Sequence, residues 1–285
     1  MADQEKRAES IKVESRSYSF HVLLDYFNER LRVEDYLGNP QHIIEKLQRL
    51  SEKHSLKKLI MYARPAHLPV FLHEGFSFEA VLKGYFRGTD AYAMALFTDP
   101  ERRNSPFWIK EDRILADVKQ KGRTPEEKPA ADVTFRNAEP EDAEQLAALY
   151  GEIFKIYPTP VTNPAYIRKG MENGTIFYIG ETDGRIISAA SADVNRNYFN
   201  AELTDCATLP EYRKGGLIKQ LLEQLEGELK KQGIFCAYSI ARALSFGMNA
   251  AFYQLGYHYG GRLANNCYIY DKIEDMNVWV KDLAE

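Results

Sequence analysis

The stretch that decides the fold runs from Asn200 to Tyr257. It begins Asn200-Ala-Glu-Leu-Thr-Asp-Cys-Ala-Thr208 and continues Leu-Pro-Glu-Tyr-Arg213-Lys-Gly-Gly-Leu-Ile218. A long amphipathic segment and an apolar segment follow, and the stretch closes with Asn249-Ala-Ala-Phe-Tyr-Gln-Leu-Gly-Tyr257. This pattern predicts a strand, a glycine-containing turn, a helix, a second strand and a second helix, in that order.

The glycine-containing turn has the features of a phosphate-binding site. Gly215 and Gly216 allow backbone amides to approach a ligand closely, and the helix that follows presents its positive N-terminus there. No Gly-Lys-Ser/Thr follows the turn, which excludes a P-loop. The Gly-x-Gly-x-x-Gly fingerprint of dinucleotide-binding folds is also absent.

Composition and charge narrow the class of protein. A chain of 285 residues favours two domains, and 45% hydrophobic residues are enough for real cores. The net charge of −4 gives no electrostatic reason to expect nucleic-acid binding. We expect a soluble cytoplasmic protein, because the N-terminus is polar and the chain has no long apolar segment. The number of cysteines is odd and they form no Cys-x-x-Cys pair, which predicts buried free thiols and no metal site. These cysteines are Cys206, Cys236 and Cys267.

The chain divides into two halves with a similar order of elements. We expect an N-terminal αβ domain over 1–132 and a second domain over 133–285. The first includes a linker segment over 99–132, with a helix expected from Phe107 to about Lys121 and an exposed stretch from Gly122 onward. Residues 1–17 look like a frayed start. The segment around Ala63-Arg64 resembles that around Ala241-Arg242, which indicates a weak internal duplication; chance similarity of two αβ units is the alternative.

The second half resembles the GNAT N-acetyltransferases. The acetyl-CoA motif of that family is Gln/Arg-x-x-Gly-x-Gly/Ala, and here it reads Arg213-Lys-Gly-Gly-Leu-Ile218. The chain departs from the motif at Ile218, where the family prefers glycine or alanine. The resemblance implies an α/β fold with a mixed sheet (α+β), with acetyl-CoA as co-substrate and no metal. The first half is then a partial, degenerate copy of the same fold, with Leu72 where the second half has Tyr253.

The resemblance also implies roles for individual residues. Glu202 is the candidate general base, with Asp205 as an alternative that strand alternation places on the opposite face. Tyr253 is the candidate acid that protonates the departing thiolate, and Asn249 the candidate contact to the pantetheine or phosphate arm. The remaining coenzyme-binding candidates are Ala207, Thr208, Arg213, Lys214, Gly215, Gly216, Leu217 and Ile218.

Three further segments extend the resemblance: Gly84-Tyr-Phe-Arg-Gly-Thr-Asp90, Ile156-Tyr-Pro-Thr-Pro160 and Glu202-Leu-Thr-Asp-Cys-Ala-Thr-Leu-Pro210. With these segments the chain most resembles the members of the family that acetylate the side-chain amine of β-lysine. The product implied is N6-acetyl-β-lysine, a compatible solute or a step in lysine metabolism. A zwitterionic diamine needs acidic and basic partners, and the candidates are Arg87, Asp90, Asp205 and Arg242. The alternatives are a polyamine, another amino acid, a protein lysine, or a non-catalytic acyl-CoA sensor. We expect a monomer or homodimer with a small-molecule partner and neither nucleic acid nor membrane.

Overall fold

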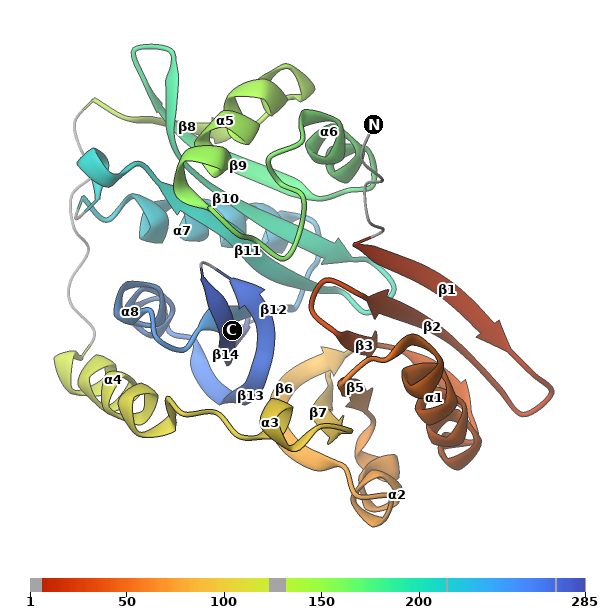
Figure 1. The fold of residues 1–285 in the computed structure, drawn as a ribbon. Coiled ribbons are helices and arrows are strands. Elements are labelled where there is room, and N and C mark those ends of the chain that lie inside the picture. The colour runs from red at the N-terminus through yellow and green to blue at the C-terminus, as the bar shows by residue number, and fades with distance from the viewer. Residues whose placement is uncertain (1–6, 123–131, 214, 270, 285) are drawn as a thin grey trace.

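The computed structural model describes residues 7–122, 132–213, 215–269 and 271–284. In this part of the chain one mixed sheet of fourteen strands runs through the molecule, and helices cover its faces (Figure 1). The strand order is β1-β2-β3-β5-β7-β6-β13-β14-β12-β11-β10-β9-β8, and β4 pairs with β2 beside this path. The mixed α/β class expected from the sequence is confirmed.

The elements of the first half and of the segment that follows it are β1 (Ala8–Glu14), β2 (Tyr18–Asp25), β3 (Arg30–Val33), β4 (Tyr36–Gly38), α1 (Pro40–His54), β5 (Lys58–Ala63), α2 (Leu68–His73), β6 (Ser77–Phe86), β7 (Thr89–Phe97), α3 (Pro100–Arg103) and α4 (Trp108–Lys121). Those of the second half are β8 (Thr134–Asn137), α5 (Ala143–Ile153), α6 (Pro164–Glu172), β9 (Ile176–Thr182), β10 (Arg185–Asn195), β11 (Asn200–Thr208), α7 (Leu217–Lys231), β12 (Cys236–Arg242), α8 (Phe246–Gln254), β13 (His258–Ile269) and β14 (Lys272–Asp282).

The two halves repeat one arrangement of strands. In the first half β3 pairs in parallel with β5, which is followed in the sheet by β7 and β6. In the second half β11 pairs in parallel with β12, which is followed by β14 and β13. This repeated topology supports the proposed duplication, with β3 in the place of β11 and β5 in the place of β12.

The halves join where β6 meets β13, and two glycines make the junction possible. Gly261 pairs with Ala80, and its φ of +144° is one that other residues rarely adopt. A Cβ atom on Gly261 would lie 2.2 Å from the Glu79 carbonyl, and one on Gly260 would lie 2.3 Å from the Val81 carbonyl. Only glycine therefore lets these two backbones approach closely enough to continue the sheet.

The alternation of side chains gives the central sheet two different faces. On β5, Leu59 and Met61 pack against the core that contains α1, whereas Ile60 and Tyr62 belong to a separate core between the halves. On β11 and β12, Leu203 and other apolar side chains pack against α7 and α8. We call the opposite side the inner face, and its core residues include Ile60, Tyr62, Leu82, Tyr238 and Val278.

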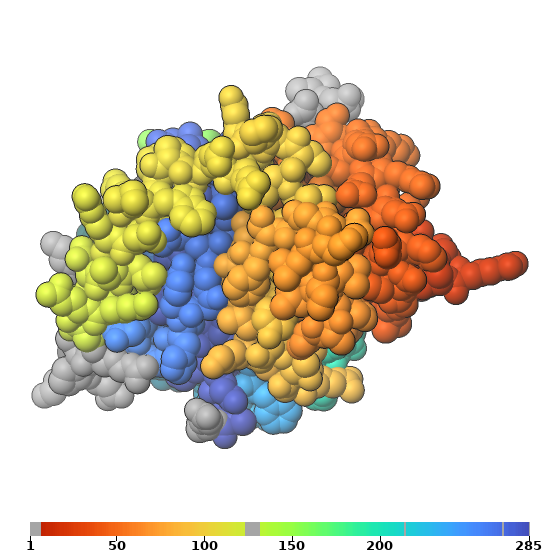
Figure 2. Space-filling model, turned by 90° about the horizontal axis from the view of Figure 1, so that it is seen from below, coloured from red at the N-terminus to blue at the C-terminus, as the bar shows by residue number. Residues whose placement is uncertain are grey.

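The segment between the halves is only partly a linker. In α4, Leu115 and Val118 belong to the same core as α7 and α8. Figure 2 shows the segment from α3 to α4, in yellow, against the blue strands of the second half. Residues 123–131 lie outside the described part of the chain. The boundary near residue 132 stays a prediction, although the packing of α4 attaches it to the second half.

Several local predictions are confirmed and others are wrong. Helix α1 begins as expected, because the Asn39 side chain accepts hydrogen bonds from the amides of Gln41 and His42. The prediction of a frayed start is wrong for Ala8–Glu14, because this segment pairs along its whole length with β2. No helix of the described residues is long and apolar enough to cross a membrane.

Candidate active site

The strands β11 and β12 diverge at the point where the family-like motif begins. They pair only from Asn200 to Glu202, with Cys236 to Tyr238 as partners. Beyond this point β11 continues on β10 as far as Thr208, and β12 continues on β14 as far as Arg242. The facing edges are therefore open to an extended ligand, which could pair with them as an added strand.

A β-bulge bends β11 within the open part. Asp205 and Cys206 together oppose Ala190, and Asp205 has a φ of +49°. The bulge resets the alternation of side chains, which corrects the expectation that Asp205 lies on the face opposite Glu202. The Asp205 carboxylate accepts a hydrogen bond from Ser191 Oγ at 2.7 Å, on the side away from the α7 core.

The turn after β11 forms the expected cradle. Gly216 has a φ of +70° and precedes α7 with no side-chain cap, and the first helical bond runs from the Gln220 amide to the Gly216 carbonyl. The amides that begin α7 therefore have no acceptor within the helix and point at any anion placed there. Arg213 Nε donates to the Thr208 carbonyl at 3.1 Å, which fixes the turn to the end of β11.

Ile218, the departure from the motif, does not fill the cradle with its side chain. It packs against the core of the second half, next to buried residues such as Leu221 and Leu222. Leu217 is also buried. The backbone of both residues remains part of the cradle, so the sequence departure leaves the donor groups in place. Lys214 lies outside the described residues.

Glu202 has the environment of a general base. It is half-buried on the inner face, directly beside Tyr238 in the strand register. Burial raises the pKa of Glu202 to about 8, while the charge of Arg32 lowers it and the charge of Asp193 raises it. A carboxyl group with this pKa holds and releases a proton near neutral pH, as acid–base catalysis requires.

Asp205 is the second carboxyl group of this region. Burial raises its pKa to about 6, and the charge of Asp193 contributes in the same direction. Hydrogen bonds from Ser191 and Tyr157 lower it. Because two hydroxyl groups already hold this carboxylate, its position suits a structural support for β11 better than a proton acceptor for a ligand.

Tyr253 lies on α8, where its ring contacts Trp279 edge-on with 6.3 Å between the ring centroids. It is half-buried against the core of the second half. Asn249, one helical turn earlier, is fully buried. Both the N–H groups and the oxygen of its side-chain amide form hydrogen bonds within the protein. Its Nδ2 donates to the Arg242 and Ser245 carbonyls, and its Oδ1 accepts from Asn277 and Trp279.

These bonds argue against the expectation that Asn249 contacts the coenzyme directly. Both N–H groups and both lone pairs of its amide have protein partners, so a ligand would have to displace one of them. Asn249 instead fixes α8 against the end of β12 and against β14. An Asn249 held in this way supports α8, the helix that carries Tyr253.

The three other candidate acceptor contacts stabilise the fold. Arg87 Nε donates to the Asn197 carbonyl at 2.6 Å, and the Asp90 carboxylate accepts from the Gly84 amide at 2.9 Å. Arg242 makes two bonds, of 2.9 and 2.7 Å, to the fully buried Glu274 carboxylate. Each charge already has a partner, which argues against an acceptor-binding role.

Comparison with known proteins agrees with this geometry. Residues 143–257 match the model of the Acetyltransferase (GNAT) family. A relative named N-acetyltransferase YodP, from Bacillus subtilis, is 40% identical over 91% of this chain and 94% of its own length. The chain belongs to the GNAT acetyltransferase family. It is an acetyl-CoA-dependent N-acetyltransferase of the GNAT type. The resemblance to this family that the sequence shows is therefore confirmed.

Two further relatives carry a more specific name. A Beta-lysine N(6)-acetyltransferase from Methanosarcina mazei is 32% identical and covers 87% of this chain and 100% of its own length. A protein of the same name from Methanococcus maripaludis is 33% identical and covers 91% and 95%. The similarity thus extends over both halves of this GNAT protein, beyond the residues that the family model matches.

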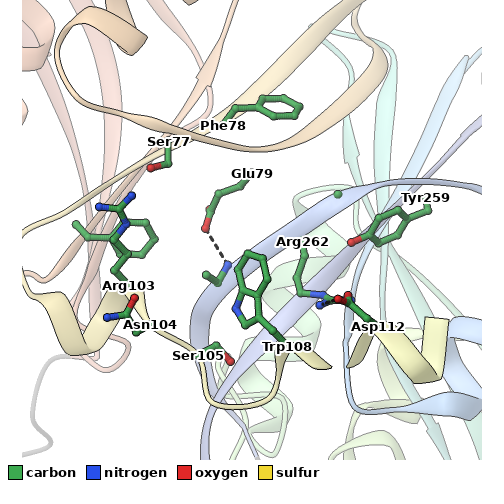
Figure 3. Close-up of a pocket in the computed structure, with 13 residues that line it drawn as sticks. Ser77, Phe78, Glu79, Arg103, Asn104, Ser105, Trp108, Asp112, Tyr259 and Arg262 are labelled. Carbon is green, nitrogen blue, oxygen red and sulfur yellow. Dashed lines mark hydrogen bonds and ion pairs between the residues drawn. The ribbon is translucent and has the colours of Figure 1, made fainter. Parts of the chain in front are cut away.

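A large hollow elsewhere in this acetyltransferase contains none of the predicted site residues. It has a volume of about 630 Å³ and lies beside the β6–β13 junction. Figure 3 shows Trp108 next to Arg262, whose guanidinium reaches Asp112 at 2.9 Å, and Glu79, which accepts from the Ala264 amide. These contacts hold α4 and the junction together, so we assign the hollow no role in acetyl transfer.

The sequence analysis missed three charged residues that act on Glu202. These are Arg32 and Glu34 from the first half and Asp193 from β10. Arg32 corresponds to Glu202 in the repeat, since it pairs with Ile60 as Glu202 pairs with Tyr238. The internal duplication was the signal that could have identified Arg32, had its register been aligned strand by strand.

Proposed function

We propose that this GNAT protein transfers acetyl from acetyl-CoA to the side-chain amine of β-lysine and forms N6-acetyl-β-lysine. The choice of β-lysine as acceptor is supported by the similarity to two relatives named Beta-lysine N(6)-acetyltransferase, which extends over nearly the whole chain. The chemistry fits the open β11–β12 edges and the raised pKa of Glu202, which is about 8. The amine attacks the thioester directly, so no covalent enzyme intermediate is needed.

The residues present fit acetyl-CoA. The amides at the start of α7, which have no acceptor within the helix, and the glycine conformation at Gly216 suit its pyrophosphate. The open edge near Ala207 and Thr208 suits its pantetheine arm. When bound, the coenzyme supplies the activated acetyl group. A Cβ atom on Gly215 would meet no heavy atom closer than 3.7 Å, so its surroundings leave the cradle open.

Two side chains move protons in the proposed reaction. Glu202 takes a proton from the acceptor ammonium, because an alkyl ammonium with a pKa near ~10.4 cannot attack. The Tyr253 hydroxyl gives a proton to the sulfur as it departs. Asp205 remains the alternative base, and the pH dependence of the rate separates the two carboxyl groups.

Steady-state kinetics with a panel of amines tests the acceptor. We expect kcat/KM to be highest for β-lysine among β-lysine, lysine, spermidine and a lysine-containing peptide. A tenfold preference for spermidine or the peptide would refute the acceptor while leaving acetyl transfer intact. No turnover of any amine, together with tight binding of acetyl-CoA in calorimetry, would favour the sensor alternative.

A second candidate is acetyl transfer to another small amine. It is favoured by the 40% identical relative, whose name specifies N-acetyl transfer without an acceptor. The same panel distinguishes the two candidates. Lysine as the best acceptor would support the second one, because it differs from β-lysine only in the position of an amino group.

A further inference from the structure

Arg32 and Glu202 occupy equivalent positions in the two halves. Arg32 lies on β3 opposite Ile60 of β5, and Glu202 lies on β11 opposite Tyr238 of β12, in the same parallel pairing. Their neighbours along each strand pack on the helix-covered sides. Both charged side chains therefore extend toward the inner face, one from each half.

The fold brings these two side chains into one region. The end of β10 and the start of β11 lie beside β2 and β3 in Figure 1, and Arg32 is the strongest attractive charge on Glu202. Contacts across this region fix the halves to each other. Asn200 Nδ2 donates to the Tyr85 carbonyl at 2.8 Å, and Arg64 donates to the Tyr198 hydroxyl at 3.2 Å.

The charged side chains around Glu202 are accessible to solvent. The side chains of Arg32 and Glu34 are 25% and 35% exposed, and Asp193 is exposed. Burial is nevertheless the leading cause that raises the pKa of both Glu202 and Asp193. A small acceptor in solution can therefore reach the charged groups around Glu202.

The guanidinium of Arg32 has donors to spare. Its Nε lies 2.9 Å from Glu34 Oε1, and among the described residues its two Nη atoms have no protein acceptor. Glu34 thus holds the side chain by one edge and leaves the outer nitrogens for a ligand. A guanidinium presented in this way matches the two oxygens of a carboxylate.

Arg32 lies at the acceptor end of β11 rather than at the coenzyme's phosphates. Glu202 is six residues before Thr208, where the cradle begins, and an extended strand of that length spans about 20 Å. The phosphates at the start of α7 are therefore far from Arg32. A carboxylate on the acceptor is the anion that is expected near Glu202.

We propose that Arg32, supplied by the first half, binds the carboxylate of the acceptor and so places its side-chain amine at Glu202. The inference rests on the proposed function and defines its acceptors as amines that carry a carboxylate. It also gives the first half a role in specificity, although it lacks the cradle. Glu34 is a positioning residue, because it acts through Arg32.

Binding measurements on the full chain with CoA present test this inference. The probes are β-lysine and 1,4-diaminopentane, which is β-lysine without its carboxyl group. For the wild-type protein we expect β-lysine to bind at least tenfold more tightly. In Arg32→Gln, the affinity for β-lysine should fall by about 10- to 100-fold, as expected for hydrogen bonds to a charged group, and that for 1,4-diaminopentane should not fall.

Two controls accompany this variant. Arg49→Gln removes the same charge from the exposed outer side of α1 and should change neither affinity. Arg32→Lys keeps the charge but not the paired donors, and it should lie between wild type and Arg32→Gln. It also provides the measurement if Arg32→Gln does not fold.

The outcomes separate this inference from the proposed function. Equal loss of affinity for both probes, or no loss for β-lysine, overturns the role of Arg32 even if the wild type acetylates β-lysine. If the wild type acetylates lysine instead, the proposed acceptor is wrong, and lysine against 1,5-diaminopentane decides the role of Arg32. A preference for amines without a carboxylate overturns both.

Discussion

Replacement of Glu202 by glutamine removes the proposed base while keeping the size and polarity of the side chain. The structure determines how strongly activity depends on pH, because burial raises the pKa of this carboxyl group to about 8. Such a group is ionised in about one molecule in eleven at pH 7 and in about ten of eleven at pH 9. Only the ionised form accepts a proton from the ammonium. Activity must therefore rise as the pH rises through this pKa.

The assay is kcat/KM for the acceptor from about pH 4.5 to pH 11 at saturating acetyl-CoA, which spans the pKa of about 6 of Asp205. If ionised Glu202 acts on the bound ammonium, kcat/KM for total amine rises to a midpoint near pH 8, levels off, and falls above ~10.4 as the amine loses its proton in solution. Between pH 7 and pH 9 the rise is about tenfold. In Glu202→Gln we expect a loss of about 10²- to 10⁴-fold near pH 8.

The shape of the profile provides the refutation. Without an enzymic base only free amine reacts, so kcat/KM would rise about tenfold per pH unit up to ~10.4 with no break near pH 8. A wild-type profile of that shape would refute the role of Glu202. A break near pH 6 that disappears in Asp205→Asn would instead identify Asp205 as the base, since its pKa is about 6.

Three further substitutions test the other parts of the site. Tyr253→Phe should lower kcat by about 10²- to 10⁴-fold with little change in KM for acetyl-CoA, whereas Tyr259→Phe, which removes a hydroxyl from another ring packed on Trp279, should keep turnover near normal. Gly216→Ala should weaken acetyl-CoA binding in calorimetry and destabilise the fold by about 1–2 kcal/mol, because φ is +70°; Gly227→Ala in the same helix should stabilise it by about 0.5–1 kcal/mol and leave affinity unchanged. Asn249→Ala should lower the free energy of unfolding, measured by urea titration, by more than about 2 kcal/mol, because it leaves the buried Trp279 and Asn277 donors unpaired. Unchanged stability together with lost acetyl-CoA binding would instead indicate that Asn249 contacts the coenzyme directly.

Local sequence signals predicted what depends on neighbouring residues. The Asn-Pro pair at residues 39–40 marked the start of α1, and the glycines at 215–216 marked the turn before α7, because caps and turns are decided by a few adjacent residues. Most of the order of strands and helices from β8 to β13 followed from the same signals. These are also the parts that the family resemblance covers.

Features that depend on the pairing of one strand with another were missed. The segment Ala8–Glu14 alternates charged and apolar residues and looks unstructured alone, but β2 gives it a full set of partners as an edge strand. Strand β14 was missed because Asn277 interrupts its apolar centre, and only the fold shows that this amide bonds to Asn249. The divergence of β11 from β12 likewise has no local signature, since it appears only in the pairing register.

The equivalence of Leu72 and Tyr253 shows how an alignment without structure misleads. It predicts a buried leucine in the first half, but Leu72 is 51% exposed, so its truncation would open no cavity. The register of β3 and β5 gives a more useful comparison, because backbone pairing is independent of which side chains have diverged. That register, and not the similarity of residues, aligns Arg32 with Glu202.

The charge of Arg32 near Glu202 bears on the proposed catalysis. In the free protein the charge of Arg32 lowers the pKa of Glu202, against the burial that raises it. An acceptor carboxylate bound to Arg32 neutralises part of that charge, while the acceptor ammonium beside Glu202 keeps the carboxylate ionised until the proton moves. Once the ammonium has given up its proton, the carboxyl group lies next to a neutral amine and a compensated guanidinium, which favours its protonated form. An amine without a carboxylate lacks the compensating charge, so under the role proposed for Arg32 the contact that selects the acceptor would also strengthen the base that activates it.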